Sequence, residues 1–422
     1  MRILHINTAT TGGAATAALR IHQGLCNQGY DSHFLTLHNS TKTIVNHHVY
    51  NGKYISSQPQ YPILSFKNLL KEKFFKVYEK SLIKYKKDKE NEIELSVPKK
   101  KDGYYTFSVF SSPFTPFDIT DLEIYKQSDI IHLHWVAGFL DYESFFSKNK
   151  KPIVWTFHDM NPIMGGFHYK IDLLKNLNSH SLEEEKFKEI KLKSYSKASL
   201  LSIVSPSKWL FDSVKDSSIF KSEDIYHVRY RIDLDLFKPR CKNLIRSVLS
   251  LPDDKLIYLI SSLDLSDFRK GTDLVLPVIE SLDMQDVIFL LAGSNFKGEI
   301  KSNVISLGPI NDELLMSFVY NAADYFILSS REDNLPNTMI ESIASGTPVI
   351  AFDIGDNKEI ILENNCGIIC DEISSNSLLM SLLLSKKIKF NSSIISKVAS
   401  EYFNEKLITD LYKNIYIKNL KI

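Results

Sequence analysis

The sequence predicts an α/β protein built of two parallel-sheet domains. Short, β-branched stretches alternate with helical stretches along the chain, a pattern that favours parallel strands connected by helices. The alternation begins near the N-terminus and restarts after a charged segment, residues 233–254, that contains two prolines. A chain of 422 residues, of which 44% are hydrophobic, can bury the cores of two or three domains, and we expect two.

The first domain opens with a strand, a glycine turn, a helix and a second strand. These elements are expected at residues 3–7, 11–15, 17–27 and 31–37. Three more strands follow at residues 129–134, 152–157 and 200–205, and a helix begins at Lys208. We therefore expect one parallel sheet within residues 1–240.

The second domain, expected at residues 241–400, repeats the alternation. Its strands are predicted at residues 256–261, 287–291, 304–306, 325–328 and 348–352. A last helix, at residues 401–422, carries Leu407, Leu411 and Ile415 at helical spacing. We expect it to bury that apolar stripe and to return to the first domain.

A basic amphipathic insertion is expected near residues 60–100. Residues 67–89 hold nine lysines and three acidic residues, and apolar side chains recur there at helical spacing. One interpretation is a helix on an anionic membrane surface, where each basic residue contributes about 1 kcal/mol. The other is a solvated helix packed on its own domain. The sequence leaves both open.

Charge and cysteine content argue against several classes of protein. The chain has 51 Lys and Arg against 50 Asp and Glu, so its overall charge gives no reason to expect a nucleic-acid partner. Four cysteines are too few for a disulfide framework, and we expect reduced core residues. The N-terminus lacks the basic and apolar stretches of a signal peptide, and no run of about 18–20 apolar residues occurs. These features predict a cytoplasmic protein.

The strongest local signal is the segment 329–350, SSREDNLPNTMIESIASGTPVI, which follows the strand YFIL. It predicts a loop, a helix that begins near residues 334–336, and another strand. The first turn of this helix has backbone N–H groups without helical partners, which suit a phosphate. Asp333 and Glu341 lie about two turns apart and could hold two hydroxyl groups of one ligand. The alternative is that Asp333 caps the helix and Glu341 is an exposed helix residue.

This segment resembles the signature of family 4 glycosyltransferases, also called group 1, in which two acidic residues flank seven others and a Gly-x-Pro-Val strand follows. Asp333 replaces the first glutamate of that signature, whereas Glu341 is in place. The resemblance implies that Asp333 binds hydroxyls of the transferred sugar at the catalytic centre and that Glu341 binds the ribose. It also implies a diphosphate site at the helix tip, formed by Asn334, Leu335, Pro336, Asn337 and Thr338.

Two further segments fit a donor diphosphate. Arg269 and Lys270 stand in DFRKGTDL, after the first strand of the second domain, and the same family has RKG at this place with the lysine on the donor phosphates. Gly12 and Gly13 follow the first strand of the chain, where a glycine turn and a helix N-terminus can approach a ligand closely. The alternatives are a solvated Arg-Lys pair and a plain tight turn.

Histidines follow two strands of the first domain. His158 precedes Asp159 at the expected carboxyl end of a strand, where parallel sheets bind their ligands. The matching family position carries a histidine that contacts the transferred sugar, so the resemblance implies a catalytic role for His158. In HLHW, the two histidines share one face of the strand. We expect core packing or acceptor contacts from His134, Trp135 and Asp159, because a metal site lacks a third ligand at recognisable spacing.

TFHDM and GGFHY resemble motifs of a subgroup of bacterial surface-polysaccharide transferases. Together the motifs imply the GT-B fold, in which two Rossmann-like, doubly wound domains face each other across a cleft. The implied reaction moves a sugar from a UDP- or GDP-sugar, with retained configuration, to a lipid-linked glycan of an O-antigen, capsule or exopolysaccharide. It would take place at the cytoplasmic face of the inner membrane, without a metal or other cofactor. Two alternatives stay open: a catalytically silent nucleotide-sugar-binding partner protein, and an epimerase or hydrolase of the same fold.

Overall fold

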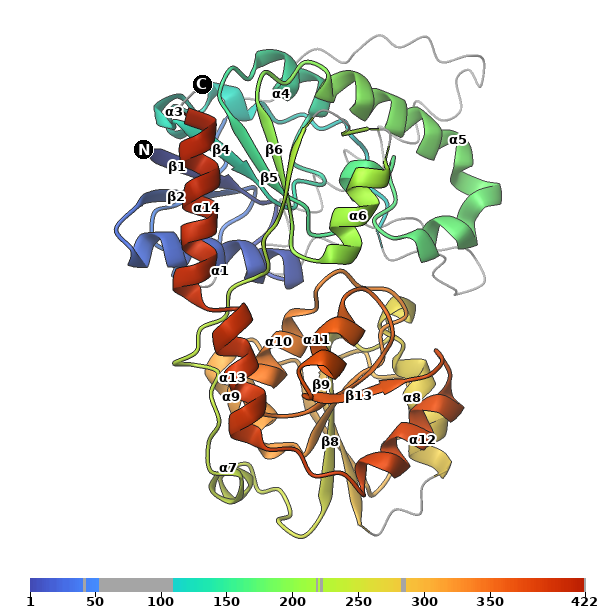
Figure 1. Cartoon of the computed structure of the whole chain (residues 1–422). Coiled ribbons are helices and arrows are strands. Elements are labelled where there is room, and N and C mark those ends of the chain that lie inside the picture. The colour runs from blue at the N-terminus through green and yellow to red at the C-terminus, as the bar shows by residue number, and fades with distance from the viewer. Residues whose placement is uncertain (41–42, 53–108, 218, 221–222, 282–285, 421–422) are drawn as a thin grey trace.

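The computed structural model describes residues 1–422 with the exception of residues 41–42, 53–108, 218, 221–222, 282–285 and 421–422. The insertion expected near residues 60–100, with its basic segment 67–89, lies outside the described residues. Within them, no helix combines the length and the apolar character needed to cross a membrane. The described chain forms two α/β domains, drawn one above the other in Figure 1.

The first domain contains a sheet of seven strands, and every neighbouring pair is parallel. The order is β3-β2-β1-β4-β5-β6-β7, so the direction of winding reverses between β1 and β4. The strands are β1 (Arg2–Ile6), β2 (Asp31–Thr36), β3 (His47–Val49), β4 (Ile130–Leu133), β5 (Ile153–Thr156), β6 (Leu201–Ser205) and β7 (Asp224–His227). The helices are α1 (Gly13–Asn27), η1 (Ile119–Asp121), α3 (Glu123–Gln127), α4 (Tyr142–Lys148), η2 (Asn161–Ile163), α5 (Lys170–Tyr195) and α6 (Lys208–Asp216).

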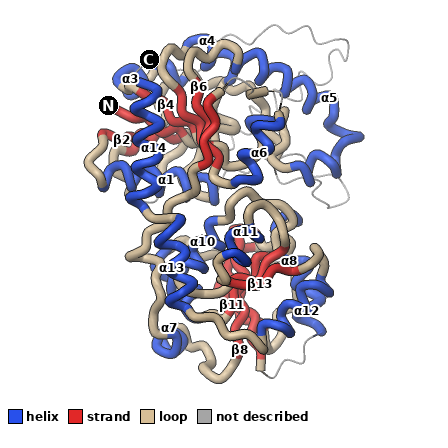
Figure 2. The backbone as a smooth tube through the Cα atoms, viewed as in Figure 1, coloured by secondary structure: helices blue, strands red, loops and turns tan. Residues whose placement is uncertain are grey.

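The second domain contains a six-stranded parallel sheet in the order β10-β9-β8-β11-β12-β13. Its strands are β8 (Leu256–Asp264), β9 (Val287–Ser294), β10 (Val304–Gly308), β11 (Tyr325–Leu328), β12 (Val349–Phe352) and β13 (Gly367–Cys370). The helices are α7 (Lys242–Val248), η3 (Phe268–Lys270), α8 (Thr272–Ser281), α9 (Glu313–Ala322), α10 (Asn337–Ala344), α11 (Asn357–Glu363) and α12 (Ser375–Ser385). The prediction of two doubly wound parallel sheets is confirmed, and Figure 2 shows the two sheets with their surrounding helices.

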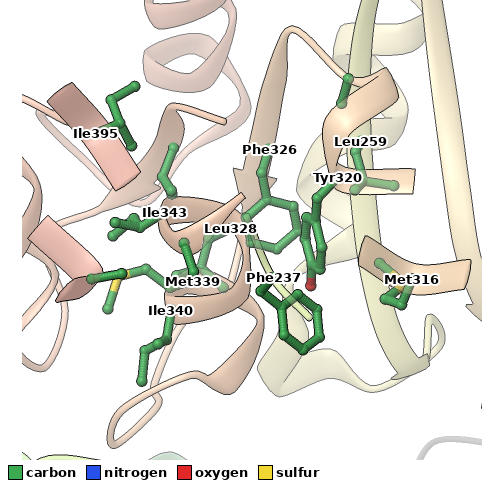
Figure 3. Close-up of a cluster of buried hydrophobic side chains, with 14 of the residues drawn as sticks. Phe237, Leu259, Met316, Tyr320, Phe326, Leu328, Met339, Ile340, Ile343 and Ile395 are labelled. Carbon is green, nitrogen blue, oxygen red and sulfur yellow. The ribbon is translucent and has the colours of Figure 1, made fainter. Parts of the chain in front are cut away.

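The main core of the second domain lies between its sheet and α9, α10 and α13 (Ser392–Tyr402). Figure 3 shows Leu259, Phe326 and Leu328 of the sheet with Met339, Ile340 and Ile343 of α10, all buried. Burying a side chain of this size stabilises the fold by about 1.5–3 kcal/mol. The sequence forms strands here because runs such as YFIL are apolar on both faces, as a sheet covered on both sides requires.

The C-terminal helix expected at residues 401–422 begins four residues later than predicted, after a break that follows α13. The chain breaks between α13 and α14 (Glu405–Leu420), and α14 packs on the sheet of the first domain, as Figure 1 shows. The apolar stripe predicted for this helix is not its buried face, because Leu407 and Leu411 are 45% and 38% exposed. The buried face carries Ile408, Tyr412, Ile415 and Tyr416. Tyrosines suit this face because their hydroxyl groups bond to polar side chains on β4 and β5.

Candidate active site

The carboxyl ends of the two sheets face each other, and side chains join them. Asn334, in the loop after β11, donates from Nδ2 to the backbone oxygen of His158 after β5 at 3.1 Å, and its Oδ1 accepts from Ser207 Oγ. Two carboxylates of the second domain bind first-domain helix N-termini, Glu332 at the start of α5 and Asp356 at the start of α6. The loops that carry the predicted site residues therefore meet between the domains.

The N-termini of α1 and α10 meet at the same place. Gly12 precedes α1 with a φ of 91°, a conformation that favours glycine, and Pro336 precedes α10; neither helix has a side-chain cap. Asn337 Nδ2 donates to the backbone oxygen of Gly13 at 2.9 Å. The first turns of both helices carry N–H groups without helical partners and the positive ends of the helix dipoles. Their proximity forms a candidate anion site.

Asp333 binds the two cations that follow β8. Lys270 Nζ is 2.6 Å from Asp333 Oδ2, and Arg269 Nη1 is 3.4 Å from the same oxygen. Burial alone would raise the pKa of Asp333, but Lys270 and Arg269 outweigh burial and hold that pKa below its usual range. The Arg269 guanidinium also stacks on Tyr169 of the first domain, with its central carbon 4.2 Å from the ring centre. Because α10 is preceded by Pro336, Asp333 is not its N-cap, which contradicts the capping alternative.

Glu341 is buried inside α10 and binds a first-domain arginine. Arg20 of α1 donates from Nη2 to Glu341 Oε1 at 2.6 Å, and Tyr320 donates to Oε2 at 3.0 Å. Burial raises the pKa of the Glu341 carboxyl, while Arg20 opposes that rise. Glu341 is 8% exposed, so the alternative of an exposed helix residue is wrong. No sequence motif marks Arg20, because its role depends on how the second domain meets α1.

The other residues predicted in the loop after β11, called the donor loop, differ in how deeply they are buried. Leu335 is 3% exposed and packs in the second-domain core, so that only its backbone can contact a ligand. Pro336 is buried at the start of α10, whereas Asn337 and Thr338 are half-buried in its first turn.

Buried histidines of the first domain form a network under the part of the site that this domain contributes. His158 Nδ1 is 2.7 Å from the hydroxyl of Tyr230, and its Nε2 is 3.1 Å from His134 Nδ1. His134 Nε2 is in turn 2.9 Å from His5 Nδ1. Burial lowers the pKa of His158 to about 4, so the ring is neutral near pH 7. Because its two ring nitrogens are engaged within the protein, His158 has no free nitrogen for a ligand in this arrangement.

The fold brings a third histidine, which no spacing in the sequence indicated, to the pair in HLHW. His5 on β1 brings a third imidazole beside His132 and His134, with one nitrogen of each ring within 4.8 Å of the others. However, both ring nitrogens of His132 are already bonded, to Tyr416 and Thr156. The rings of His132 and His134 are also tilted against each other by 32°, with their centres only 4.1 Å apart. Ligands must point in their ring planes at a metal, so this arrangement favours a hydrogen-bond network.

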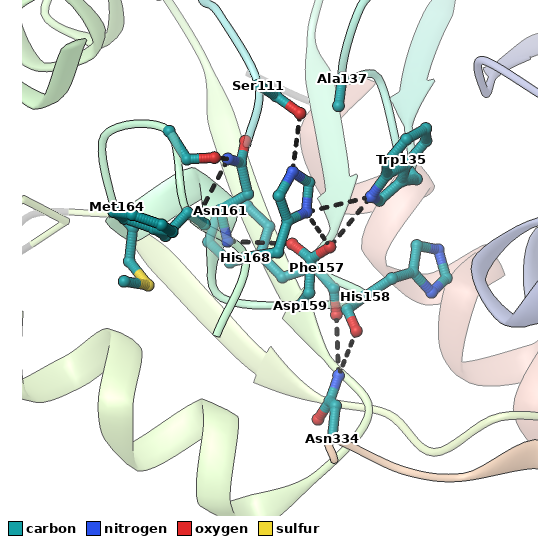
Figure 4. Close-up of polar contacts among 12 residues, drawn as sticks. Ser111, Trp135, Ala137, Phe157, His158, Asp159, Asn161, Met164, His168 and Asn334 are labelled. Carbon is teal, nitrogen blue, oxygen red and sulfur yellow. Dashed lines mark hydrogen bonds and ion pairs between the residues drawn. The ribbon is translucent and has the colours of Figure 1, made fainter. Parts of the chain in front are cut away.

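Trp135 and Asp159 border a small cavity at the carboxyl ends of β4 and β5. Trp135 Nε1 donates to Asp159 Oδ2 at 2.9 Å, and His168 Nδ1 lies 2.5 Å from the same oxygen (Figure 4). The cavity is lined by His134, Trp135, Val136, Ala137, Tyr142, Trp155, His158, Asp159, Asn161, Pro162 and His168. His168 was not among the predicted site residues, although it stands in the GGFHY motif.

Helix α5 holds the loop that carries His168. The Glu184 carboxylate accepts the backbone N–H groups of Gly165, Gly166 and Phe167 at 2.6, 2.7 and 3.1 Å. Lys191 Nζ donates to two backbone oxygens and one amide oxygen of residues 161–164. Burial lowers the pKa of Lys191 to about 7. Two buried side chains of α5 therefore hold this loop in place.

Comparisons with known proteins agree with this architecture. Residues 254–383 match the family model described as "Glycosyl transferases group 1". No curated protein sequence matches the chain. The fold is similar to sucrose-phosphate synthase from Thermosynechococcus elongatus, with a TM-score of 0.64, 15% identity, and 99% of each chain covered.

Two further solved structures have the same fold. HepE of Anabaena, in complex with UDP and glucose, has a TM-score of 0.64 at 14% identity, with 99% of each chain covered. WaaG, a glycosyltransferase involved in lipopolysaccharide biosynthesis, has a TM-score of 0.56 at 14% identity, covering 97% of this chain and 95% of WaaG. The second domain thus matches the model of the group 1 glycosyl transferases, and the chain as a whole shares the GT-B fold of these solved structures.

Proposed function

We propose that the protein transfers a sugar from a UDP- or GDP-sugar, with retained configuration, to a lipid-linked glycan of a bacterial surface polysaccharide. The donor would lie between the domains, with its diphosphate on the tips of α1 and α10. The observation that carries this proposal is the convergence of two uncapped helix N-termini with Lys270, Arg269 and the carboxylates Asp333 and Glu341.

The chemistry of the leaving group explains why these groups belong together. As the bond between the sugar and the diphosphate breaks, negative charge develops on the phosphate oxygens. Lys270 and Arg269 supply fixed positive charge, and the helix tips supply N–H donors and dipoles that need no rearrangement. Lys270 is the more accessible cation, since its side chain is 27% exposed against 12% for Arg269. Asp333, which both cations hold ionised, would accept hydroxyls of the sugar.

Glu341 would bind the ribose hydroxyls. In the described structure its two carboxylate oxygens bind Arg20 and Tyr320. A ribose would therefore share these oxygens or replace one of the two partners, and Arg20 would remain close enough to contact the nucleotide.

The proposed acceptor and the proposed location of the reaction are supported by other observations. The resemblance of TFHDM and GGFHY to surface-polysaccharide transferases supports a glycan acceptor, and the similarity in fold to WaaG is compatible with it. The basic segment 67–89 supports contact with an anionic membrane, and the proposed location of the reaction is the cytoplasmic face of the inner membrane.

The test begins with the donor. Wild-type protein and Lys270→Met are titrated with UDP, GDP and ADP by calorimetry, and release of nucleotide from UDP- and GDP-sugars is measured with bacterial lipid extract. Losing one charge-assisted contact of about 1.5–3 kcal/mol weakens nucleotide binding roughly 10- to 150-fold. Lys126→Met is the matched control, because Lys126 also pairs with an aspartate, Asp121, on the exposed side of α3. Equal affinities of Lys270→Met and wild type would contradict the proposal.

A further inference from the structure

An aromatic ring of the first domain lies against one of the two cations of the candidate donor site. Tyr169, the last residue of GGFHY, directly precedes α5, and its ring centre is 4.2 Å from the central carbon of the Arg269 guanidinium. Arg269 belongs to η3 of the second domain, so this contact joins the two domains. Burial raises the pKa of the Tyr169 hydroxyl well above its usual value, so the ring stays neutral and the contact is a cation–π interaction.

The ion pairs of Arg269 are too long to fix its guanidinium by themselves. Nη1 is 3.4 Å from Asp333 Oδ2 and Nη2 is 3.5 Å from Asp267 Oδ2, whereas charge-assisted hydrogen bonds of this kind measure about 2.7–2.9 Å. One hydrogen bond adds to them, from Nη1 to the backbone oxygen of Glu332 at 3.1 Å. The plane of the guanidinium therefore depends largely on its contact with Tyr169.

Arg269 is held in a position that leaves one of its donors unpaired. Its Nε is buried and has no acceptor among the residues that the structure describes. A long side chain with an unpaired N–H would gain a hydrogen bond by turning toward water or toward a nearby carboxylate. The ring of Tyr169 opposes that turn, and so keeps the positive charge beside Asp333 and Lys270.

Tyr169 is itself held in place on both sides. Before it, the Glu184 carboxylate binds the N–H groups of residues 165–167. After it, the first two N–H groups of α5 donate to the Glu332 carboxylate at 3.2 and 2.8 Å. Glu332 also accepts from Arg269 through its backbone oxygen, so the contact that brings Glu332 to α5 brings the guanidinium to the ring as well. The orientation of Arg269 is thus tied to the meeting of the two domains.

We propose that Tyr169 is a positioning residue for sugar transfer, whose ring orients Arg269 toward the donor diphosphate when the domains meet, an inference that rests on the proposed function. Negative charge develops on the diphosphate as its bond to the sugar breaks. A cation that is already oriented stabilises this charge without a rearrangement during the reaction. Tyr169 acts through Arg269 in this role and needs no contact with either substrate.

The test measures kcat and KM for nucleotide release from UDP- and GDP-sugars by the full-length protein with bacterial lipid extract. Tyr169→Leu and Tyr169→Met remove the aromatic face with two different shapes, whereas Tyr169→Phe keeps it. Loss of the cation–π contact should lower kcat roughly 2- to 30-fold, with a smaller change in the donor KM, and Tyr169→Phe should keep the kcat of wild type. Tyr402→Leu is the matched control, because the Tyr402 ring also lies against an arginine, with its centre 5.0 Å from the central carbon of Arg229.

A second background separates positioning from a purely structural role. If the ring acts through Arg269, Tyr169→Leu should lower kcat no further in an Arg269→Gln protein, because both substitutions remove the same interaction. An equal fold loss in the two backgrounds would overturn the positioning role. Unchanged kcat in Tyr169→Leu and Tyr169→Met, or an equal loss in Tyr169→Phe, would also overturn it and leave the proposed function standing, because nucleotide is still released. Wild-type protein that releases no nucleotide would overturn the proposed function and the role of Tyr169 together.

Discussion

Lowering the pH should destabilise the first domain through its buried histidines. Burial lowers the pKa of His22 and of His158 to about 4, and lowers the pKa values of His5, His132 and His134 well below the usual 6.5. An unfolded chain exposes the same rings to water, where they take up a proton near pH 6.5. Below that pH the unfolded state binds more protons than the folded state, so acid favours unfolding.

The size of the effect follows from the lowered pKa values of His22 and His158. For a group with a pKa of about 4 when folded and about 6.5 when unfolded, the stabilisation is present above pH 6.5 and is lost as the pH falls toward 4. Between pH 8 and pH 5 the loss is on the order of 2 kcal/mol for each such histidine. His22 and His158 together therefore remove about 4 kcal/mol, a large part of the usual 5–15 kcal/mol of a folded domain.

Tryptophan fluorescence can follow this domain alone. The three tryptophans of the chain, Trp135, Trp155 and Trp209, all lie in the first domain. Urea unfolding monitored by their emission at pH 8, 7, 6 and 5 gives the free energy of unfolding of wild type and of His22→Gln. Groups common to both proteins cancel in the difference between the two pH dependences. The variant should lose about 2 kcal/mol less than wild type between pH 8 and 5. Parallel pH dependences of wild type and variant would refute the reasoning.

Three other substitutions test individual contacts. Arg20→Met leaves the Glu341 carboxylate buried without its cation, so the free energy of unfolding measured in urea should fall by about 3–5 kcal/mol. If adding Glu341→Gln to the same chain restores none of this stability, the ion pair is not the cause. Gly165→Ala places a methyl group 1.9 Å from a backbone oxygen of α5, so the Tm measured by calorimetry should be lower by several degrees. An unchanged Tm would show that the loop moves to accommodate the methyl group without cost. Tyr412→Phe removes a 2.9 Å hydrogen bond between α14 and β5 and should cost about 1 kcal/mol in urea, with a zero cost speaking against a role for this bond in docking the helix.

The positions of most strands and of the donor loop were predictable from the sequence, whereas β3, β7 and β13 were not predicted. The strand predicted at residues 325–328 coincides with β11, and α10 begins at Asn337, next to the predicted start. Local signals suffice here because apolar runs, proline and glycine act on the backbone within a few residues. The α14 stripe was missed for a related reason: Tyr412 and Tyr416 are amphipathic, and their burial depends on polar partners in the sheet.

Only the tertiary structure decided which side chains share the site. Arg20 and Glu341 are 321 positions apart, and Ser111 and His168 are 57 apart, so no periodicity in the sequence relates them. Helical crossovers bring the carboxyl ends of parallel strands to one edge, and the meeting of the two domains then selects the partners. The sequence by itself determined the elements and the residue types, because those depend on neighbours along the chain. Which side chains pair depends instead on how distant segments pack, as for Arg20 with Glu341 and for His168 with Asp159. That packing is set by the burial of the whole core.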